Sequence, residues 1–223
     1  MARSPAFLFD LDGTLVDSVY QHVLAWKRAL ENASIPLSVW RIHRRIGMSG
    51  GLFITALARE LGCTISDEDL RRIQSDHSQA YAELVAGVRP LPGANALIAY
   101  LTDHGIPWAI ATSGRRSLTA LTLRALDLPP DAPVITRDDV EHAKPDPDLF
   151  LAAAARLGMP IGDCLVVGDS VWDILASRRA STLGIGLLSG GYGLEELQSA
   201  GAYRVYEDPA DLLHHLDEVG VRP

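Results

Sequence analysis

Two aspartates, Asp10 and Asp12, end the first apolar run of the chain and are followed by Gly13. The run, residues 6–9, has the length and composition of a buried strand. Because side chains alternate along a strand, a spacing of two residues sends both carboxylates toward the same side. Two carboxylates this close repel each other unless a cation lies between them. A strand that ends in an ordinary Asp-Gly turn would have the same local sequence, so later residues must decide.

Polar clusters also follow three later apolar runs. They are Thr112-Ser113-Gly114 after 108–111, Lys144 in the loop after 134–136, and Asp169 with Asp173 after 165–168. If these runs are strands of one parallel sheet, their carboxyl ends meet at one edge, where doubly wound sheets bind ligands. Unpaired charges at the ends of apolar strands are costly. The clusters therefore favour a functional site over scaffolding.

These residue types suit phosphoryl transfer. The four aspartates would concentrate negative charge in one crevice, and oxygen ligands without His or Cys favour Mg²⁺ as the compensating cation. The Thr112 hydroxyl and the N–H groups that follow it, at the start of a helix, form a ready anion site. Lys144 supplies a positive charge for phosphate and for a nucleophilic carboxylate. An aspartate can attack phosphorus while a second one protonates the leaving oxygen and later activates water, and Asp10 and Asp12 are placed for these two roles.

The elements that must position these residues fall into two parts. Residues 17–87 show helical patterns and no convincing strand, whereas helices and strands alternate from about residue 93 onward. Such alternation predicts a parallel sheet covered on both faces. We therefore predict an α/β fold, with a doubly wound, Rossmann-like core formed by 1–16 and 88–223 and an α-helical cap, 17–87, inserted after the first strand.

Several local signals predict where helices begin. An apolar face with Val23 and Trp26 marks a helix after Ser18, and Ser18 with Gln21 is a candidate capping box. Asp146-Pro147 and Asp208-Pro209 each resemble an N-cap followed by a proline in the first turn. Trp26 and Trp40 are expected in the core of the cap.

Composition limits the functional class. The 223 residues have a net charge of −8, which argues against a broad nucleic-acid surface. No apolar run approaches the ~20 residues of a membrane-spanning helix, and the early first strand leaves no room for a signal peptide. Cys63 and Cys164 are expected to be buried free thiols of a reducing compartment. We expect a cytoplasmic protein without a membrane or nucleic-acid partner, and a monomer by default because no exposed apolar heptad is present.

The series D-x-D-G-T, Thr-Ser, Lys-Pro and G-D-S-x-x-D resembles the haloacid dehalogenase-like superfamily over nearly the whole chain. The insertion after the first strand is similar to the helical cap of its phosphoglycolate phosphatases and β-phosphoglucomutases. The resemblance implies that Asp10 is the nucleophile and a Mg²⁺ ligand. It makes Asp12 the general acid/base, which also gives the metal its backbone carbonyl.

The resemblance implies roles for the later motifs as well. Thr112, with the amides of Ser113 and Gly114, would bind the phosphoryl group, and Lys144 would hold that group and Asp10 together. Asp169 would ligate the metal, and Asp173 would support the metal site from outside the set of direct ligands. Thr112 as a helix cap and Asp173 as an acid that complements a helix dipole remain alternatives.

The branch within the superfamily is set by fewer residues. Asp12 argues for phosphate chemistry, because true haloacid dehalogenases lack an acid there. His22 would match the cap-side, substrate-binding histidine of β-phosphoglucomutase, although a histidine on an amphipathic helix is as often structural. His77 replaces the mutase's cap lysine, and the loop 47–51, our candidate specificity loop, has no match for its arginine. His77, Arg44, Arg45 and Arg116 are expected to be solvated.

We therefore predict an enzyme, a Mg²⁺-dependent phosphatase that hydrolyses a small-molecule phosphomonoester through an aspartyl-phosphate. A sugar-phosphate mutase of the β-phosphoglucomutase type is the alternative. A non-catalytic binding protein with the same fold is disfavoured by the complete set of acids.

Overall fold

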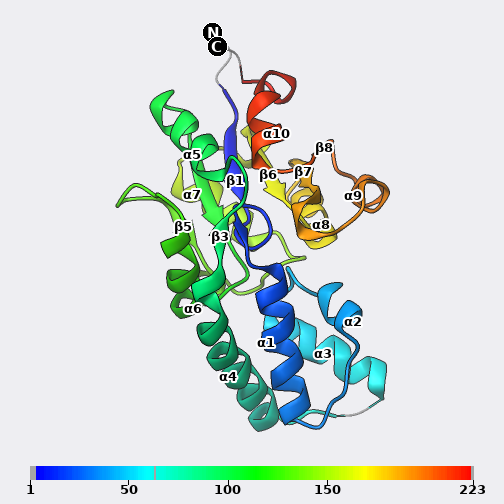
Figure 1. The fold of residues 1–223 in the computed structure, drawn as a ribbon. Coiled ribbons are helices and arrows are strands. Elements are labelled where there is room, and N and C mark those ends of the chain that lie inside the picture. The colour runs from blue at the N-terminus through cyan, green and yellow to red at the C-terminus, as the bar shows by residue number, and fades with distance from the viewer. Residues whose placement is uncertain (1–3, 63, 222–223) are drawn as a thin grey trace.

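The computed structural model describes residues 4–62 and 64–221, so Cys63 lies outside the described residues. A six-stranded parallel sheet has the order β5-β4-β1-β6-β7-β8 (Figure 1). Its strands are β1 (Ala6–Phe9), β4 (Trp108–Ala111), β5 (Val134–Ile135), β6 (Cys164–Gly168), β7 (Leu183–Leu187) and β8 (Arg204–Tyr206). The predicted doubly wound α/β core is confirmed.

The first strand lies in the middle of this sheet, between β4 and β6. Phe7 pairs with Trp108 on one side and with Leu165 on the other. All residues of β1 and β4 are buried, as expected for strands covered on both faces. The chain order reverses on either side of β1, so the crevice at its carboxyl end is the switch point of the sheet.

Helices cover both faces of the sheet. The helices of this part of the chain are α5 (Ala94–Asp103), α6 (Arg116–Thr122), α7 (Asp148–Arg156), α8 (Val171–Arg179), α9 (Leu194–Ala200) and α10 (Pro209–His214). Helices α5 and α10 pack with Phe7 and Phe9 in one apolar cluster, whereas α7 packs with Leu8 and Val166 in another. Alternate residues of the central strands thus bury opposite faces, as their period of two requires.

Short 3₁₀ segments complete the regular structure. They are Val85–Gly87, Leu123–Ala125, Arg137–Asp139, Ile161–Asp163, Leu188–Gly190 and Leu216–Val219. Among the described residues, no helix is long and apolar enough to span a membrane.

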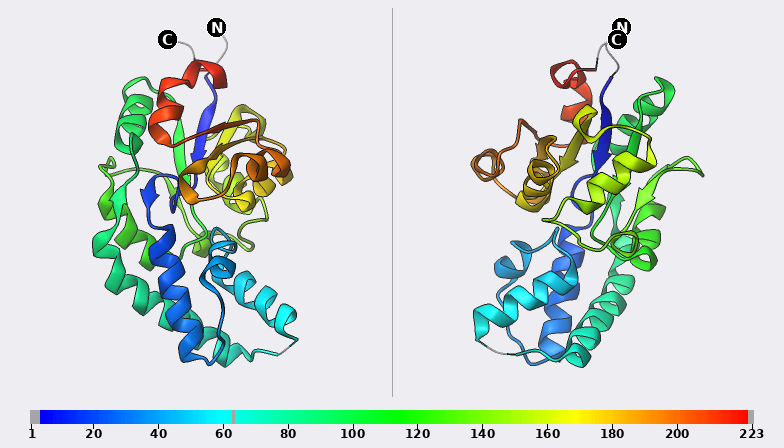
Figure 2. Two further views of the ribbon diagram at one scale, coloured as in Figure 1. Left: turned by 45° about the vertical axis from the view of Figure 1, so that its right-hand side comes forward. Right: turned by 180° about the vertical axis from the view of Figure 1, so that it is seen from behind.

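Four helices form the lower body of the molecule (Figures 1 and 2). They are α1 (Val19–Asn32), α2 (Val39–His43), α3 (Gly50–Leu61) and α4 (Asp67–Leu84). They enclose an apolar cluster of their own that includes Trp26, Phe53 and Ile73. These helices are the predicted helical insertion; its proposed limits, 17 and 87, stay a prediction.

A two-stranded antiparallel ribbon, absent from our expectations, lies where the chain passes between the two bodies. Strands β2 (Val16–Asp17) and β3 (Arg89–Pro90) pair as Val16 with Pro90 and Asp17 with Arg89. Two-residue strands carry no periodic signal, which is why the sequence pattern did not show them.

Three local expectations were wrong. Ser18 precedes α1 but makes no cap; its hydroxyl binds Asp12 instead. Helix α7 has Pro147, not Asp146, at its N-cap, and Asp146 accepts a hydrogen bond from Arg179 at 2.9 Å. Trp40 is 67% exposed, whereas Trp26 is buried as expected. The Asp208-Pro209 cap of α10 is confirmed.

Candidate active site

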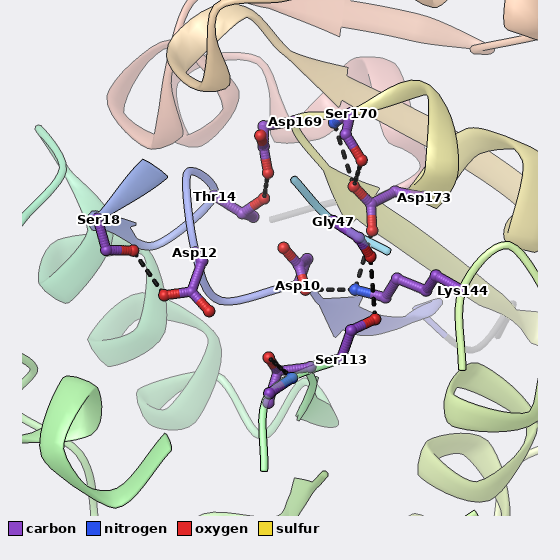
Figure 3. A network of polar contacts seen from close by, with 12 residues as sticks. Asp10, Asp12, Thr14, Ser18, Gly47, Ser113, Lys144, Asp169, Ser170 and Asp173 are labelled. Atoms are coloured by element: carbon purple, nitrogen blue, oxygen red, sulfur yellow. Dashed lines mark hydrogen bonds and ion pairs between the residues drawn. The ribbon is translucent and has the colours of Figure 1, made fainter. Parts of the chain in front are cut away.

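The predicted site residues lie at the carboxyl edge of the sheet, around β1, β4 and β6 (Figure 3). A cleft of about 350 Å³ separates this edge from the four helices, and Asp10, Asp12 and His22 line it together with Thr112–Gly114. Lys144, Asp169 and Asp173 lie behind this lining, at the side of Asp10. The structure thus brings all nine candidate residues around one cleft.

Three carboxylates form a compact acidic cluster. Oxygen atoms of Asp10, Asp169 and Asp173 lie within 4.8 Å of one another, and all three side chains are buried. Thr14 donates a hydrogen bond of 2.9 Å to Asp169, and the Ser170 hydroxyl donates one of 2.6 Å to Asp173. Buried carboxylates repel unless a cation compensates them, and an all-oxygen donor set fits a hard cation such as Mg²⁺.

Glycines allow the chain to approach this cluster closely. A Cβ atom at Gly190 would lie 1.7 Å from Oδ2 of Asp169, and one at Gly13 would lie 2.6 Å from the same atom. Gly13 also has a φ of +88°, in the left-handed region that favours glycine. The turn after Asp12 and the segment after β7 therefore both lie in close contact with the Asp169 side chain.

Lys144 contacts two of the three carboxylates of the acidic cluster, one of them the nucleophile candidate Asp10. Its side chain is fully buried, its Nζ pairs with Asp10, and the same atom lies 2.9 Å from Oδ1 of Asp173. Burial alone would lower the pKa of Lys144, but the two carboxylates outweigh it and raise the pKa above its ordinary value. Lys144 is therefore a permanent positive charge in this site.

The pKa of Asp10 rises to about 7, because burial and the nearby Asp173 and Asp12 outweigh the attraction of Lys144. The pKa of Asp169 is raised well above its usual range, first by burial and then by Asp173 and Asp10. Both shifts have the same origin, an excess of buried negative charge. A cation bound to the cluster would reverse them.

Asp12 has a different environment from Asp10. Its carboxylate lies outside the acidic cluster and accepts a hydrogen bond of 2.6 Å from Ser18, while Nε2 of His22 lies 3.2 Å from its Oδ1. Burial raises the pKa of Asp12, but the His22 imidazole and these hydrogen bonds outweigh it and lower the pKa. The pKa values of the two aspartates that follow β1 are thus shifted in opposite directions, because their neighbours differ.

Thr112, Ser113 and Gly114 form the opposite wall of the cleft. The amide of Gly114 donates to the Thr112 hydroxyl at 3.0 Å, and Arg115, not Thr112, is the N-cap of α6. Thr112 therefore does not serve as the helix cap, and its hydroxyl still has a proton to donate. Ser113 donates to the carbonyl of Gly47 at 3.0 Å, which ties this wall to the loop 47–51.

His77 was expected to be solvated, and this was wrong. It is only 7% exposed, its ring stacks on Trp26 with centroids 4.0 Å apart, and its Nε2 lies 3.2 Å from Nδ1 of His22. Burial lowers the pKa of His77 well below its ordinary value, so the imidazole is neutral. A signal existed, since residue 77 is four residues from both Ile73 and Tyr81 on the buried face of α4.

Arg44 is another residue whose role the sequence did not show. Its backbone carbonyl accepts hydrogen bonds from the Tyr192 hydroxyl at 2.9 Å and the Trp172 indole at 3.3 Å. Its guanidinium lies over the Tyr192 ring and pairs with Glu196. We call these contacts the Arg44 clasp; they hold the segment before Gly47 against the core.

The chain matches a known class of hydrolases. A family model for haloacid dehalogenase-like hydrolases matches residues 5–181. The chain belongs to this family, which confirms the resemblance that its motifs carry.

Relatives of known name include both phosphatases and a mutase. The chain is 33% identical to hexitol phosphatase A of Escherichia coli over 80% of each chain. It is 31% identical to a phosphoglycolate phosphatase of Rhodospirillum rubrum, covering 93% of this chain and 88% of the relative. Identity to the β-phosphoglucomutase of Bacillus subtilis is 29%, over 83% and 84% of the two chains.

A solved structure extends the similarity to the whole fold. A hydrolase from Pseudomonas syringae superposes with a TM-score of 0.96 at 54% identity, covering 98% of this chain and all of that one. The arrangement of sheet and helical insertion is thus shared with an experimentally determined hydrolase.

Proposed function

We propose that the protein is a Mg²⁺-dependent phosphatase that hydrolyses a small-molecule phosphomonoester through an aspartyl-phosphate on Asp10. The observation that carries the proposal is the buried Lys144, which pairs with Asp10 beside the wall formed by Thr112–Gly114. The names of the phosphatase relatives support it.

The acidic cluster would hold the metal. Side-chain oxygens of Asp10 and Asp169 are the proposed ligands, together with the backbone carbonyl of Asp12, and Asp173 supports them. Oδ1 of Asp173 is buried and lies 2.9 Å from Nζ of Lys144, so this oxygen faces the lysine and would also face a cation in the cluster. Bound Mg²⁺ would neutralise the cluster and the phosphate charge.

The residues of the chain would then perform two displacements. A carboxylate oxygen of Asp10 attacks phosphorus, the bond between phosphorus and the ester oxygen breaks, and Asp12 gives a proton to that oxygen, so that an alcohol leaves. A water then attacks the aspartyl-phosphate while Asp12 takes its proton, which releases phosphate and restores Asp10.

The remaining candidates position the transferring group. Thr112 and the amides of Ser113 and Gly114 would bind its oxygens at one wall, and Lys144 would hold it against Asp10. The insertion, residues 17–87, is the proposed cap that closes over the substrate and excludes water. His22 would contribute from the cap side through its contact with Asp12.

A sugar-phosphate mutase is the second candidate. The contact between His22 and Asp12 favours it, because His22 is where the resemblance places the mutase's histidine. Against it, the loop 47–51 has no arginine. A mutase would isomerise a sugar phosphate faster than it releases phosphate, and product analysis separates the two.

We propose further that the enzyme acts in the cytoplasm, as a monomer, on a soluble substrate and without a nucleic-acid or membrane partner. The net charge of −8 supports the absence of a nucleic-acid partner.

The decisive experiment measures phosphate release from a panel of phosphomonoesters, with Mg²⁺ and with a chelator. We expect metal-dependent release that Asp10→Asn abolishes. Asp103→Asn, which makes the same change at an exposed site on α5, is the matched control and should keep full activity. Release that persists in Asp10→Asn would rule out the aspartyl-phosphate.

A further inference from the structure

We infer that the cap side of the cleft recognises a neutral, polyhydroxylated leaving group, and that the side-chain amide of Gln74 is its specificity-determining contact. The inference rests on the proposed function and narrows it to phosphate esters of sugars and polyols, as opposed to phosphorylated carboxylic acids.

Gln74 is placed at the meeting point of the two walls. It lies on α4, lines the same cleft as Asp10 and Thr112, and is half-buried. Its Oε1 accepts a hydrogen bond from Nη2 of Arg115 at 3.4 Å. Its Nε2 lies 3.6 Å from the position that a Cβ of Gly51 would occupy. With Oε1 engaged by Arg115, the amide N–H groups are left as donors at the loop 47–51.

Neighbouring side chains supply further donors and acceptors without charge. The Ser78 hydroxyl donates to the backbone carbonyl of Gln74 at 2.8 Å, so the lone pairs of the hydroxyl remain as acceptors. Ser49 accepts from the amide of Leu52 at 3.4 Å, so its proton remains to be donated. Both residues line the cleft. Donors beside acceptors suit hydroxyl groups, since each hydroxyl both donates and accepts.

An apolar surface completes the cap wall. Trp26 lines the cleft but is only 6% exposed, because His77 stacks on its ring. Gly50 lies so close to the ring that a Cβ would be 2.9 Å from it, so a side chain at this position would meet Trp26. Apolar surface with a few placed polar groups is the usual composition of a small-molecule site.

The cap wall offers no unpaired cation to a carboxylate. Of the described cap residues that line the cleft, Arg45 alone has a permanent charge. Its guanidinium already pairs with Glu60 and donates to the Arg41 carbonyl at 2.7 Å. His77, in the same wall, is buried against Trp26. A substrate carboxylate would lose its hydration here without gaining an ion pair.

The core side of the rim carries mixed charge. Arg115 and Arg137 line the cleft there, but Glu141 and Asp146 line it too. Arg115 lies 3.8 Å from Asp138, and Arg137 donates to the Val140 carbonyl at 2.6 Å; these two guanidinium groups are the rim cations that a carboxylate would meet. The test therefore includes both arginines.

The test compares two substrates that differ at one carbon. Glycerol phosphate ends in a hydroxymethyl group where phosphoglycerate has a carboxylate. We expect kcat/KM, measured as phosphate release with Mg²⁺, to be higher for glycerol phosphate than for phosphoglycerate by about tenfold or more. Gln74→Ala should decrease this ratio by about tenfold. Gln79→Ala, on the exposed face of the same helix, is the matched control and should leave the preference unchanged.

Two larger substrates test which kind of polyhydroxylated leaving group the cleft recognises. A hexose phosphate presents a ring and a hexitol phosphate an open chain; a higher kcat/KM for either one over phosphoglycerate supports the inference and identifies the class. An equal fall for both three-carbon substrates in Gln74→Ala would overturn the role of Gln74.

Other outcomes overturn the substrate class. A preference for phosphoglycerate that Arg137→Gln or Arg115→Gln removes would show that the rim binds a carboxylate, while the phosphatase itself stands. Absence of Mg²⁺-dependent release from every ester, p-nitrophenyl phosphate included, would remove the proposed function along with the inference.

Discussion

Nζ of Lys144 lies 2.9 Å from Oδ1 of Asp173, and neither side chain is exposed to solvent. The same ammonium pairs with Asp10, so one buried positive charge faces a cluster of three carboxylates. Such an arrangement is balanced only when a second cation joins it. The lysine and the proposed metal therefore share the compensation of one charge cluster.

Removal of Lys144 should destabilise the protein in a way that Mg²⁺ partly corrects. Lys144→Ala leaves buried carboxylates without their partner, which costs about 3–5 kcal/mol of unfolding free energy. Lys27→Ala removes an exposed partner of Glu31 on α1 and should cost less than about 0.5 kcal/mol. Thermal denaturation with and without Mg²⁺ checks this. An equal Mg²⁺-induced rise in Tm for wild type and Lys144→Ala would contradict the shared compensation.

Gly190 should be needed for the metal site and not for folding. A Cβ at this position would meet Asp169 at 1.7 Å, so Gly190→Ala must displace that carboxylate. We expect the Mg²⁺ concentration for half-maximal activity to rise by about tenfold or more. Gly162→Ala, where no atom lies within 4 Å of the new Cβ, is the control. A Mg²⁺ titration with wild-type half-saturation in Gly190→Ala would show that the Asp169 carboxylate has no part in holding the metal.

Most of the fold, and the residues that form the acidic cluster, could be predicted from the sequence. Strands such as Ala6–Phe9 and Trp108–Ala111 have strong apolar signals, and their bounds were predicted without error. The acids that follow β1 and β6 were placed by topology, because the carboxyl ends of parallel strands meet at one edge.

What the sequence did not show depends on contacts across the chain. Ser18 has the spacing of a helix cap, but its hydroxyl donates to the Asp12 carboxylate at 2.6 Å and accepts no amide of α1. Arg44 has the type of a solvated residue, and only the approach of Tyr192 and Trp172 gives its carbonyl a role. Such partners, about 130 to 150 residues away, leave no local pattern.

The buried His77 should make the protein less stable in acid. Its pKa in the folded state lies well below 6.5, so the unfolded chain takes up a proton that the folded one does not. Stability from this residue is complete above about pH 6.5 and falls as the pH decreases below it. In His77→Asn this contribution disappears, so its unfolding free energy should decrease less than that of wild type between about pH 7.5 and about pH 5.5.

Urea unfolding at the two pH values measures this difference, with the exposed His214→Asn as the control for loss of an imidazole. The comparison between variants cancels the contributions of the acidic cluster. A steeper fall in His77→Asn than in wild type would reverse the sign and contradict a neutral His77.

The Arg44 clasp should set the affinity for substrate more than the stability of the fold. Tyr192→Phe keeps the ring under the Arg44 guanidinium and removes only the hydroxyl that binds the Arg44 carbonyl. Loss of one such hydrogen bond weakens the closed position of the segment before Gly47 by about 1 kcal/mol, which corresponds to about a fivefold rise in KM. Steady-state kinetics measures KM and kcat, and Tyr203→Phe, on an exposed ring, is the control. A rise in KM with unchanged Tm fits a clasp that acts on closure, whereas a lower Tm with unchanged KM would make the contact purely structural.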